Sequence, residues 1–151
     1  MTERVALRGY DTTLDRAGLS LGAGGFAGGV VASILVAIGG PPSPLGILLG
    51  FIVGVVITAM AAVAVAGPMW LVAHAMHRRG PGTAALIGAV CGFALFLGGQ
   101  TYGFGLFAMP AVDARTLMFR WISAAATSVI LAGLSAAIGL VMWRVAYRRI
   151  Y

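Results

Sequence analysis

Long stretches without a charged residue constrain this chain more than any other feature of its sequence. No Asp, Glu, Lys or Arg occurs from Ala17 to His77, from Gly80 to Val112 or from Trp121 to Trp143. An α-helix needs about 20 apolar residues to cross a hydrocarbon core that is about 30 Å thick. The second and third stretches each fit one such helix, and the first fits two if something divides it.

A segment rich in glycine and proline, residues 39–44, divides the first stretch. Proline has no backbone N–H and its ring clashes with the preceding turn, so this segment cannot lie inside a helix. We therefore predict an all-α, polytopic membrane protein. Its four transmembrane helices are expected to form an up-down-up-down bundle, because short connections make neighbouring helices antiparallel. The predicted spans, within a single domain of residues 1–151, are about 19–38, 45–73, 83–107 and 121–143.

The composition is typical of a chain whose surface faces lipid. Hydrophobic residues make up 60% of it and charged residues 9%, whereas a soluble domain is typically about 25% charged. The net charge is +6, carried by ten arginines without a lysine. On a soluble protein this excess would suggest nucleic acid. Here the arginines flank the predicted spans, where membrane orientation and anionic lipid explain them, so we expect no nucleic-acid partner.

The arginines also predict the orientation of the spans. Eight lie in the N-terminal arm, the loop after the second span and the C-terminal tail, and two, Arg115 and Arg120, lie on the opposite side. Because positive residues favour the cytoplasmic side, both termini are expected in the cytoplasm. The bias to Ala, Gly and Val, and to Arg over Lys, suggests a bacterial inner membrane. The cytoplasmic rim that would hold anionic head groups consists of Arg78, Arg79, Arg144, Arg148 and Arg149.

The N-terminal arm, residues 1–17, is either a short interfacial helix or a polar tail. Its apolar residues follow helical spacing and its charged residues project elsewhere, as in a helix that lies in the membrane surface. These residues are Leu7, Tyr10, Leu14 and Ala17 on the apolar side.

The second predicted span is too long for the membrane. Residues 45–73 would measure about 43 Å as a helix at 1.5 Å per residue, against a core of about 30 Å. Pro68 leaves the carbonyl of Ala64 without its helical partner. We therefore predict a bend near Pro68 that brings residues 69–77 to the inner interface.

Small residues recur at four-residue spacing in every predicted span. Lipid is as apolar as leucine, so transmembrane helices associate by close backbone approach, which small residues allow. These faces indicate either packing inside one bundle or contact with another chain. The first span has glycine on several faces, Gly18 and Gly22 among them, which favours a partner helix. The glycines expected to pack are Gly22, Gly25, Gly29, Gly46, Gly50, Gly54, Gly88, Gly92, Gly99 and Gly103.

A few polar residues share one depth in the predicted spans. Amides and hydroxyls need hydrogen-bond partners in hydrocarbon. They form either an interhelical hydrogen-bond layer or a small polar site open to the outside. Gln100 is expected to be the most buried strongly polar side chain and to bond a neighbouring helix. The members of this layer are Ser33, Gln100, Thr101, Thr127 and Ser128.

Catalytic and metal-binding chemistry is not indicated. Catalysis usually needs positioned acid–base groups, and we predict that the chain is not an enzyme and holds no cofactor or metal. His74 and His77 could begin a metal site, but further ligands are not near them in sequence, so we interpret them as interfacial residues. All carboxylates lie outside the predicted spans, at Glu3, Asp11, Asp15 and Asp113.

Three functions remain open at this point. The leading one is a non-catalytic accessory or structural subunit of an inner-membrane complex or a homo-oligomer. The second is a channel or facilitator for a neutral or weakly polar solute, which a continuous polar cavity would favour. The third is a lipid- or quinone-binding protein, which an apolar lateral cleft would favour. The aromatic residues considered for the third are Phe93, Phe96, Phe104 and Phe107.

Overall fold

The computed structural model describes residues 10–41, 43–103 and 113–149. Within them, four helical segments are long and apolar enough to cross a membrane. This confirms the predicted all-helical chain with four candidate spans. The segments are Leu14–Gly39, Pro44–Ala75, Pro81–Tyr102 and Ala114–Ala146.

Short polar caps determine where the helices begin. Helix α1, Leu14–Gly39, begins after Thr13, whose hydroxyl accepts a hydrogen bond from the Arg16 N–H at 3.4 Å. Helix α2, Pro44–Ala61, begins after Ser43, which caps it in the same way at 3.0 Å. Such caps satisfy N–H groups that have no partner inside the helix. The glycine- and proline-rich segment therefore lies between two helices, as predicted.

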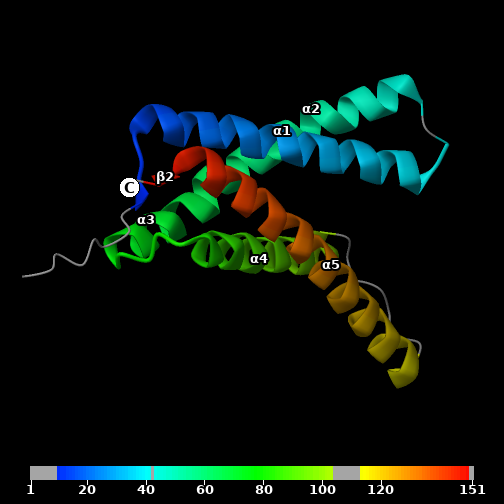
Figure 1. The fold of residues 1–151 in the computed structure, drawn as a ribbon. Helices are drawn as coiled ribbons and strands as arrows, with labels where there is room; N and C mark the ends of the chain where they lie inside the picture. Colours follow the sequence, from blue (N-terminus) through cyan, green and yellow to red (C-terminus); the bar gives the residue numbers. More distant parts are fainter. Residues whose placement is uncertain (1–9, 42, 104–112, 150–151) are drawn as a thin grey trace, which may run out of the picture.

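The described part of the N-terminal arm is extended at first and becomes helical only from Leu14, where α1 begins. Tyr10–Asp11 form strand β1, which pairs antiparallel with strand β2, Arg148–Arg149. Between residue 10 and Thr13 the chain is therefore not helical, and the helical residues of the arm, 14–17, are the first turn of α1. Residues 1–9 lie outside the described part of the chain. The pairing places the two ends of the chain on one side of the molecule (Figure 1).

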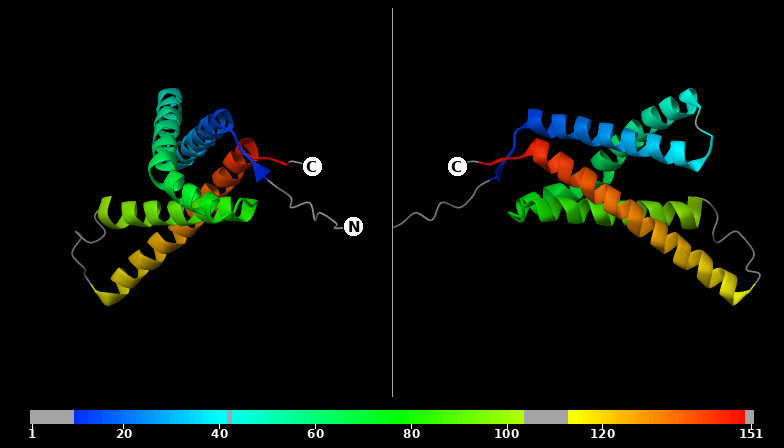
Figure 2. Two further views of the ribbon diagram at one scale, coloured as in Figure 1. Left: turned by 90° about the vertical axis from the view of Figure 1, so that its left-hand side faces the viewer. Right: turned by 45° about the vertical axis from the view of Figure 1, so that its right-hand side comes forward.

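The second span bends, as the position of Pro68 predicts. Helix α2 passes into a π-helical turn, η1 at Ala62–Ala66, and then into helix α3 at Gly67–Ala75. The Gly67 N–H bonds the Ala62 carbonyl, five residues back instead of four. Pro68 has no N–H to continue the regular pattern, and π-turns and prolines are common causes of kinks. The change of direction between α2 and α3 is visible in Figure 2.

A Schellman turn ends α3 at the start of the following loop. The Arg78 N–H bonds the Ala73 carbonyl at 2.9 Å, and the His77 N–H bonds the His74 carbonyl at 3.1 Å. His77 has a φ of 57°, the left-handed conformation that this turn requires at its central position. His77 therefore has a backbone role that its imidazole does not explain.

The second half of the chain is a hairpin of two long helices. Helix α4, Pro81–Gly98, continues into a second π-helical segment, η2 at Gly99–Gly103. Helix α5, Ala114–Ala146, begins after the Asp113 cap and has 33 residues. It starts well before the predicted span, because Asp113 supplies a cap that the uncharged stretch does not include. At helical rise it measures about 50 Å, so its first turns extend beyond a hydrocarbon core of about 30 Å.

The four helices form an open arrangement of two hairpins. Helix α1 packs on α2, α4 packs on α5, and the hairpins meet where α1 packs on α5. Helices α2 and α4 share no packed face, although α3 touches α4 (Figure 1). Helices α1 and α5 lie close together near the end that holds the strands and separate away from it (Figure 1). Among the described residues, α2 therefore has α1 as its long neighbour, and α4 has α5.

Candidate functional site

Of the five residues in the predicted polar layer, two form a side-chain hydrogen bond between helices. Gln100 lies in η2, and its amide nitrogen donates to the Ser128 hydroxyl on α5 at 3.0 Å. It also lies 3.4 Å from the Ala124 carbonyl. The predicted bond to a neighbouring helix is therefore present. Gln100 is half-buried, whereas the hydroxyl residues Ser128 and Thr101 are buried, so Gln100 is not the most buried polar residue of the layer.

The other members of the layer do not join this pair. The Ser33 hydroxyl donates to the Ile47 carbonyl, in the α1–α2 hairpin, at 3.3 Å. Thr127 is exposed and donates to its own helix at the Ser123 carbonyl. Thr101 is buried and also donates within its own helix, to the Leu97 and Gly98 carbonyls. The sequence predicted a common depth for these residues, but their hydroxyls bond different partners and do not form one layer.

Replacing Gln100 with leucine is expected to destabilise the chain only slightly, by about 1 kcal/mol, because interhelical hydrogen bonds in membranes average about 0.6 kcal/mol. Unfolding in mixed detergent micelles would measure the loss. Thr127→Val is the control, since Thr127 is exposed and bonds its own helix. A loss above about 3 kcal/mol, beyond the known range for such bonds, would contradict this interpretation of the pair.

Most of the predicted packing glycines are used inside the chain. A Cβ at Gly54 would lie 2.5 Å from the Ala32 Cβ, and one at Gly88 would lie 2.5 Å from the Ser135 carbonyl oxygen. Gly25, Gly29 and Gly50 likewise face the α1–α2 contact, and Gly92 faces α5. At these positions the two helices of each hairpin approach closely.

The other predicted glycines are less closely packed. A Cβ at Gly46 would lie 2.8 Å from the hydroxyl of its own capping residue, Ser43, and at ordinary van der Waals distance, 3.9 Å, from Val36 of α1. A Cβ at Gly22 or Gly99 would meet nothing within 4 Å, so these two do not pack against the described residues. The surroundings of Gly103 lie outside the described part of the chain.

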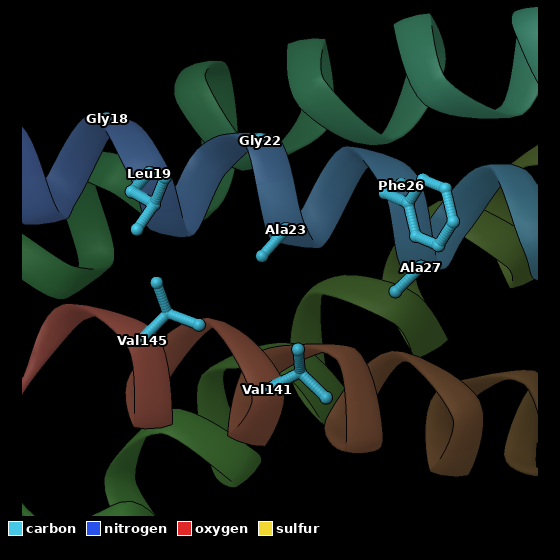
Figure 3. Close-up of a pocket in the computed structure, with 8 residues that line it drawn as sticks. All are labelled: Gly18, Leu19, Gly22, Ala23, Phe26, Ala27, Val141 and Val145. Carbon is cyan, nitrogen blue, oxygen red and sulfur yellow. The ribbon is translucent and has the colours of Figure 1, made fainter.

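An apolar groove of about 760 Å³ runs between α1 and α5 (Figure 3). Val141 and Val145 of α5 point toward α1 across it. Gly18, like Gly22, has open space where a side chain would be. The sequence showed this glycine pair, but not that the last helix returns beside it. The α1 residues that line the groove are Gly18, Leu19, Gly22, Ala23, Phe26 and Ala27.

Aromatic side chains gather beside the strands. The Tyr147 hydroxyl lies 3.3 Å from His74 Nδ1. The Trp70 ring is 5.2 Å from that of His74 and 6.4 Å from that of Tyr147. Tyr147 is buried, and this burial raises the pKa of its phenol, although Trp70 and Arg79 oppose the rise. The phenol therefore remains protonated and able to donate to His74 at neutral pH.

The predicted basic rim lies around this aromatic cluster. Trp143 donates its indole N–H to the Arg79 carbonyl at 3.0 Å, so the loop after α3 is fixed to α5. Arg78 and Arg144 are exposed. The remaining two arginines of the rim form β2. Positive charge from the loop, α5 and the tail is thus placed at one end of the molecule.

No protein-family model, curated protein or solved structure matches this chain significantly. The described residues also contain no group of three His, Cys, Asp or Glu side chains that could hold a metal ion. Of the aromatic residues considered for a quinone, Phe93 is half-buried and Phe96 is exposed on α4, and Phe104 and Phe107 lie outside the described residues. The fold defines a helical protein whose four long helices suit a membrane.

Proposed function

We propose that this protein is a non-catalytic accessory or structural subunit of a complex or homo-oligomer in a bacterial inner membrane, with both termini in the cytoplasm. The observation that carries this proposal is the missing neighbour of α2. In a closed four-helix bundle each helix packs against two others. Among the described residues, α2 packs extensively against α1 and against no other long helix, and the long helix that packs against α4 is α5.

The unpaired face of α2 is continuous through the membrane. Gly50 and Gly54 turn toward α1. A different face of α2 contains large residues that are spaced three and four apart from one another, so they lie in one row along the helix. The large residues of this face are each about half exposed or more. They are Leu49 (51%), Ile52 (49%), Val56 (50%) and Met60 (66%).

Exposure to lipid is not costly in itself, because lipid is as apolar as these side chains. The open arrangement supports a subunit role because α2 and α4 do not pack against each other, which leaves one side of each helix without a helical neighbour. Helices of another subunit, or of a second copy, would supply the missing neighbours of α2 and α4. The solute channel has less support, because Gln100 and Ser128 satisfy each other and Thr127 bonds its own helix.

Affinity purification from the native membrane in a mild detergent tests this proposal. The full chain is expected to co-purify with a stoichiometric membrane protein or as a homo-oligomer. Val56→Trp on the open face of α2 should reduce this association. Ile130→Trp, at a still more exposed site on α5 (68%, against 50% for Val56), should not. Recovery of the unaltered chain as a monomer without a partner would contradict the proposal.

The proposed orientation predicts the behaviour of C-terminal reporter fusions. Eight of the ten arginines flank the side on which the ends meet, and positive residues favour the cytoplasm. A fluorescent reporter that folds only in the cytoplasm should therefore be bright at the C-terminus, and a periplasmic phosphatase should be inactive there. The phosphatase should become active when fused in the loop near Asp113. The reverse pattern would overturn the orientation.

A further inference from the structure

The groove between α1 and α5 is open, apolar and lined by small residues on one wall. Gly18 and Gly22 leave room that no other described atom fills within 4 Å of their missing Cβ positions. Leu19 (68% exposed) and Phe26 (61% exposed) border this room on the same helix. Val141 and Val145 close the opposite wall (Figure 3). The groove therefore accepts a narrow hydrocarbon group.

The length of the groove matches one leaflet of a bilayer. From Gly18 to Ala27 the α1 wall rises about 14 Å at 1.5 Å per residue, which is half of a hydrocarbon core of about 30 Å. Beyond this level α1 and α5 separate, as both Figure 1 and Figure 2 show. A transmembrane helix from another chain would cross both leaflets and would lack this wall for half its length. A lipid acyl chain occupies one leaflet and fits the groove throughout.

The polar end of the groove carries a positive charge. Arg16 comes just before the first lining residue of α1, and Arg144 is exposed beside Val145 on α5. The pairing of β1 with β2 holds two further arginines in the chain segment that immediately follows α5. Among the residues beside the groove whose side chains the structure describes, the two arginines, Arg16 and Arg144, outnumber the one aspartate, Asp15, and no ion pair in the described part of the chain neutralises Arg144.

We propose that this groove binds an anionic glycerophospholipid from the leaflet that meets the chain ends. One acyl chain lies along Gly18 and Gly22, and the phosphate head group lies at the arginine end. Each basic residue near the membrane surface contributes about 1 kcal/mol toward an anionic lipid. This site is separate from the open face of α2, so it does not depend on the proposed subunit role.

Native mass spectrometry of the purified full chain can test head-group selection. The probes are phosphatidylglycerol and phosphatidylcholine with identical acyl chains, supplied at equal concentration. The chain should retain phosphatidylglycerol preferentially. Arg144→Gln should lower the ratio of retained phosphatidylglycerol to phosphatidylcholine about fivefold, the factor that corresponds to about 1 kcal/mol. Equal retention of the two lipids by the unaltered chain would overturn the proposal.

Filling the groove tests its position. The double variant Gly18→Leu/Gly22→Leu should lose bound phosphatidylglycerol, because the new side chains occupy the path of the acyl chain. Gly133→Leu on α5 is the matched control, since a Cβ there also meets nothing within 4 Å. Circular dichroism would establish that the variants remain helical. If the double variant is not helical, the single variant Gly22→Leu takes its place.

Three outcomes would overturn the assignment. The first is unchanged retention of phosphatidylglycerol in the filled variant. The second is displacement of the lipid by a neutral isoprenoid quinone at equal concentration, which would assign the groove to that ligand. The third is a dimer of the chain that is observed for the unaltered protein and disappears in the filled variant, which would assign the groove to a protein interface. A loss confined to the filled variant and to Arg144→Gln supports the lipid site.

Discussion

Gly88→Leu is expected to separate α4 from α5 and to lower the stability of the folded chain by 1–3 kcal/mol or more, the range typical of overpacking. The Cβ of any residue at this position would lie 2.5 Å from the Ser135 carbonyl oxygen and 3.1 Å from the Ala136 Cα. These are backbone atoms, so no change of side-chain rotamer relieves the clash. Unfolding in mixed micelles, followed by tryptophan fluorescence, would measure the loss.

Gly133→Leu is the control for Gly88→Leu, because it makes the same chemical change on the same hairpin in open space. It should change stability by no more than about 0.5 kcal/mol, as surface substitutions usually do. Equal effects of the two substitutions would show that α4 and α5 do not approach as closely as described.

Gly54→Leu is expected to disrupt the other hairpin by a similar amount, about 1–3 kcal/mol. Its Cβ would lie 2.5 Å from the Ala32 Cβ and 3.0 Å from both the Gly28 carbonyl oxygen and the Gly29 Cα. At Gly54 the backbone of α2 therefore lies directly against the backbone of α1. The same unfolding measurement applies.

The matched control for Gly54→Leu is Gly39→Leu, which lies at the end of α1 in open space. Because Gly54 and Gly88 belong to different hairpins, the losses in the double variant should add within about 0.5 kcal/mol. A strongly non-additive result would mean that the two hairpins are coupled more tightly than the contacts of α1 with α5 and of α3 with α4 suggest.

The number of long helices, the break at residues 39–44 and the bend at Pro68 could be predicted because each has a local cause. Uncharged length, missing N–H groups and ring clashes act within a few residues of the chain. The early start of α5 also has a local signal, the Asp113 cap, which the search for uncharged stretches excluded. The strand pairing at Tyr10 had no such signal, because its partner is at the opposite end of the sequence.

The candidate sites were predicted less well because they depend on how the helices are turned and paired. Depth along a helix follows from counting residues, so Gln100 and Ser128 could be placed at one level. The direction around the helix separates Thr127 from Ser128, and the partner helix separates Ser33 from both. The groove needs Gly22 and Val141 on adjacent walls, which requires that the first and last helices be neighbours.

A photochemical cross-link from the open face of α2, in native membranes, tests the proposed subunit role most directly. Cys91 is the only cysteine, so Cys91→Ala gives a cysteine-free chain in which Val56→Cys can be labelled with a benzophenone maleimide. The Val56 label should yield a protein adduct of defined mass, either a partner subunit or a second copy. A label at Ile130, placed by Ile130→Cys, should yield none. If the Val56 label gives no more protein adduct than the Ile130 label, the face meets only lipid and the subunit role is wrong.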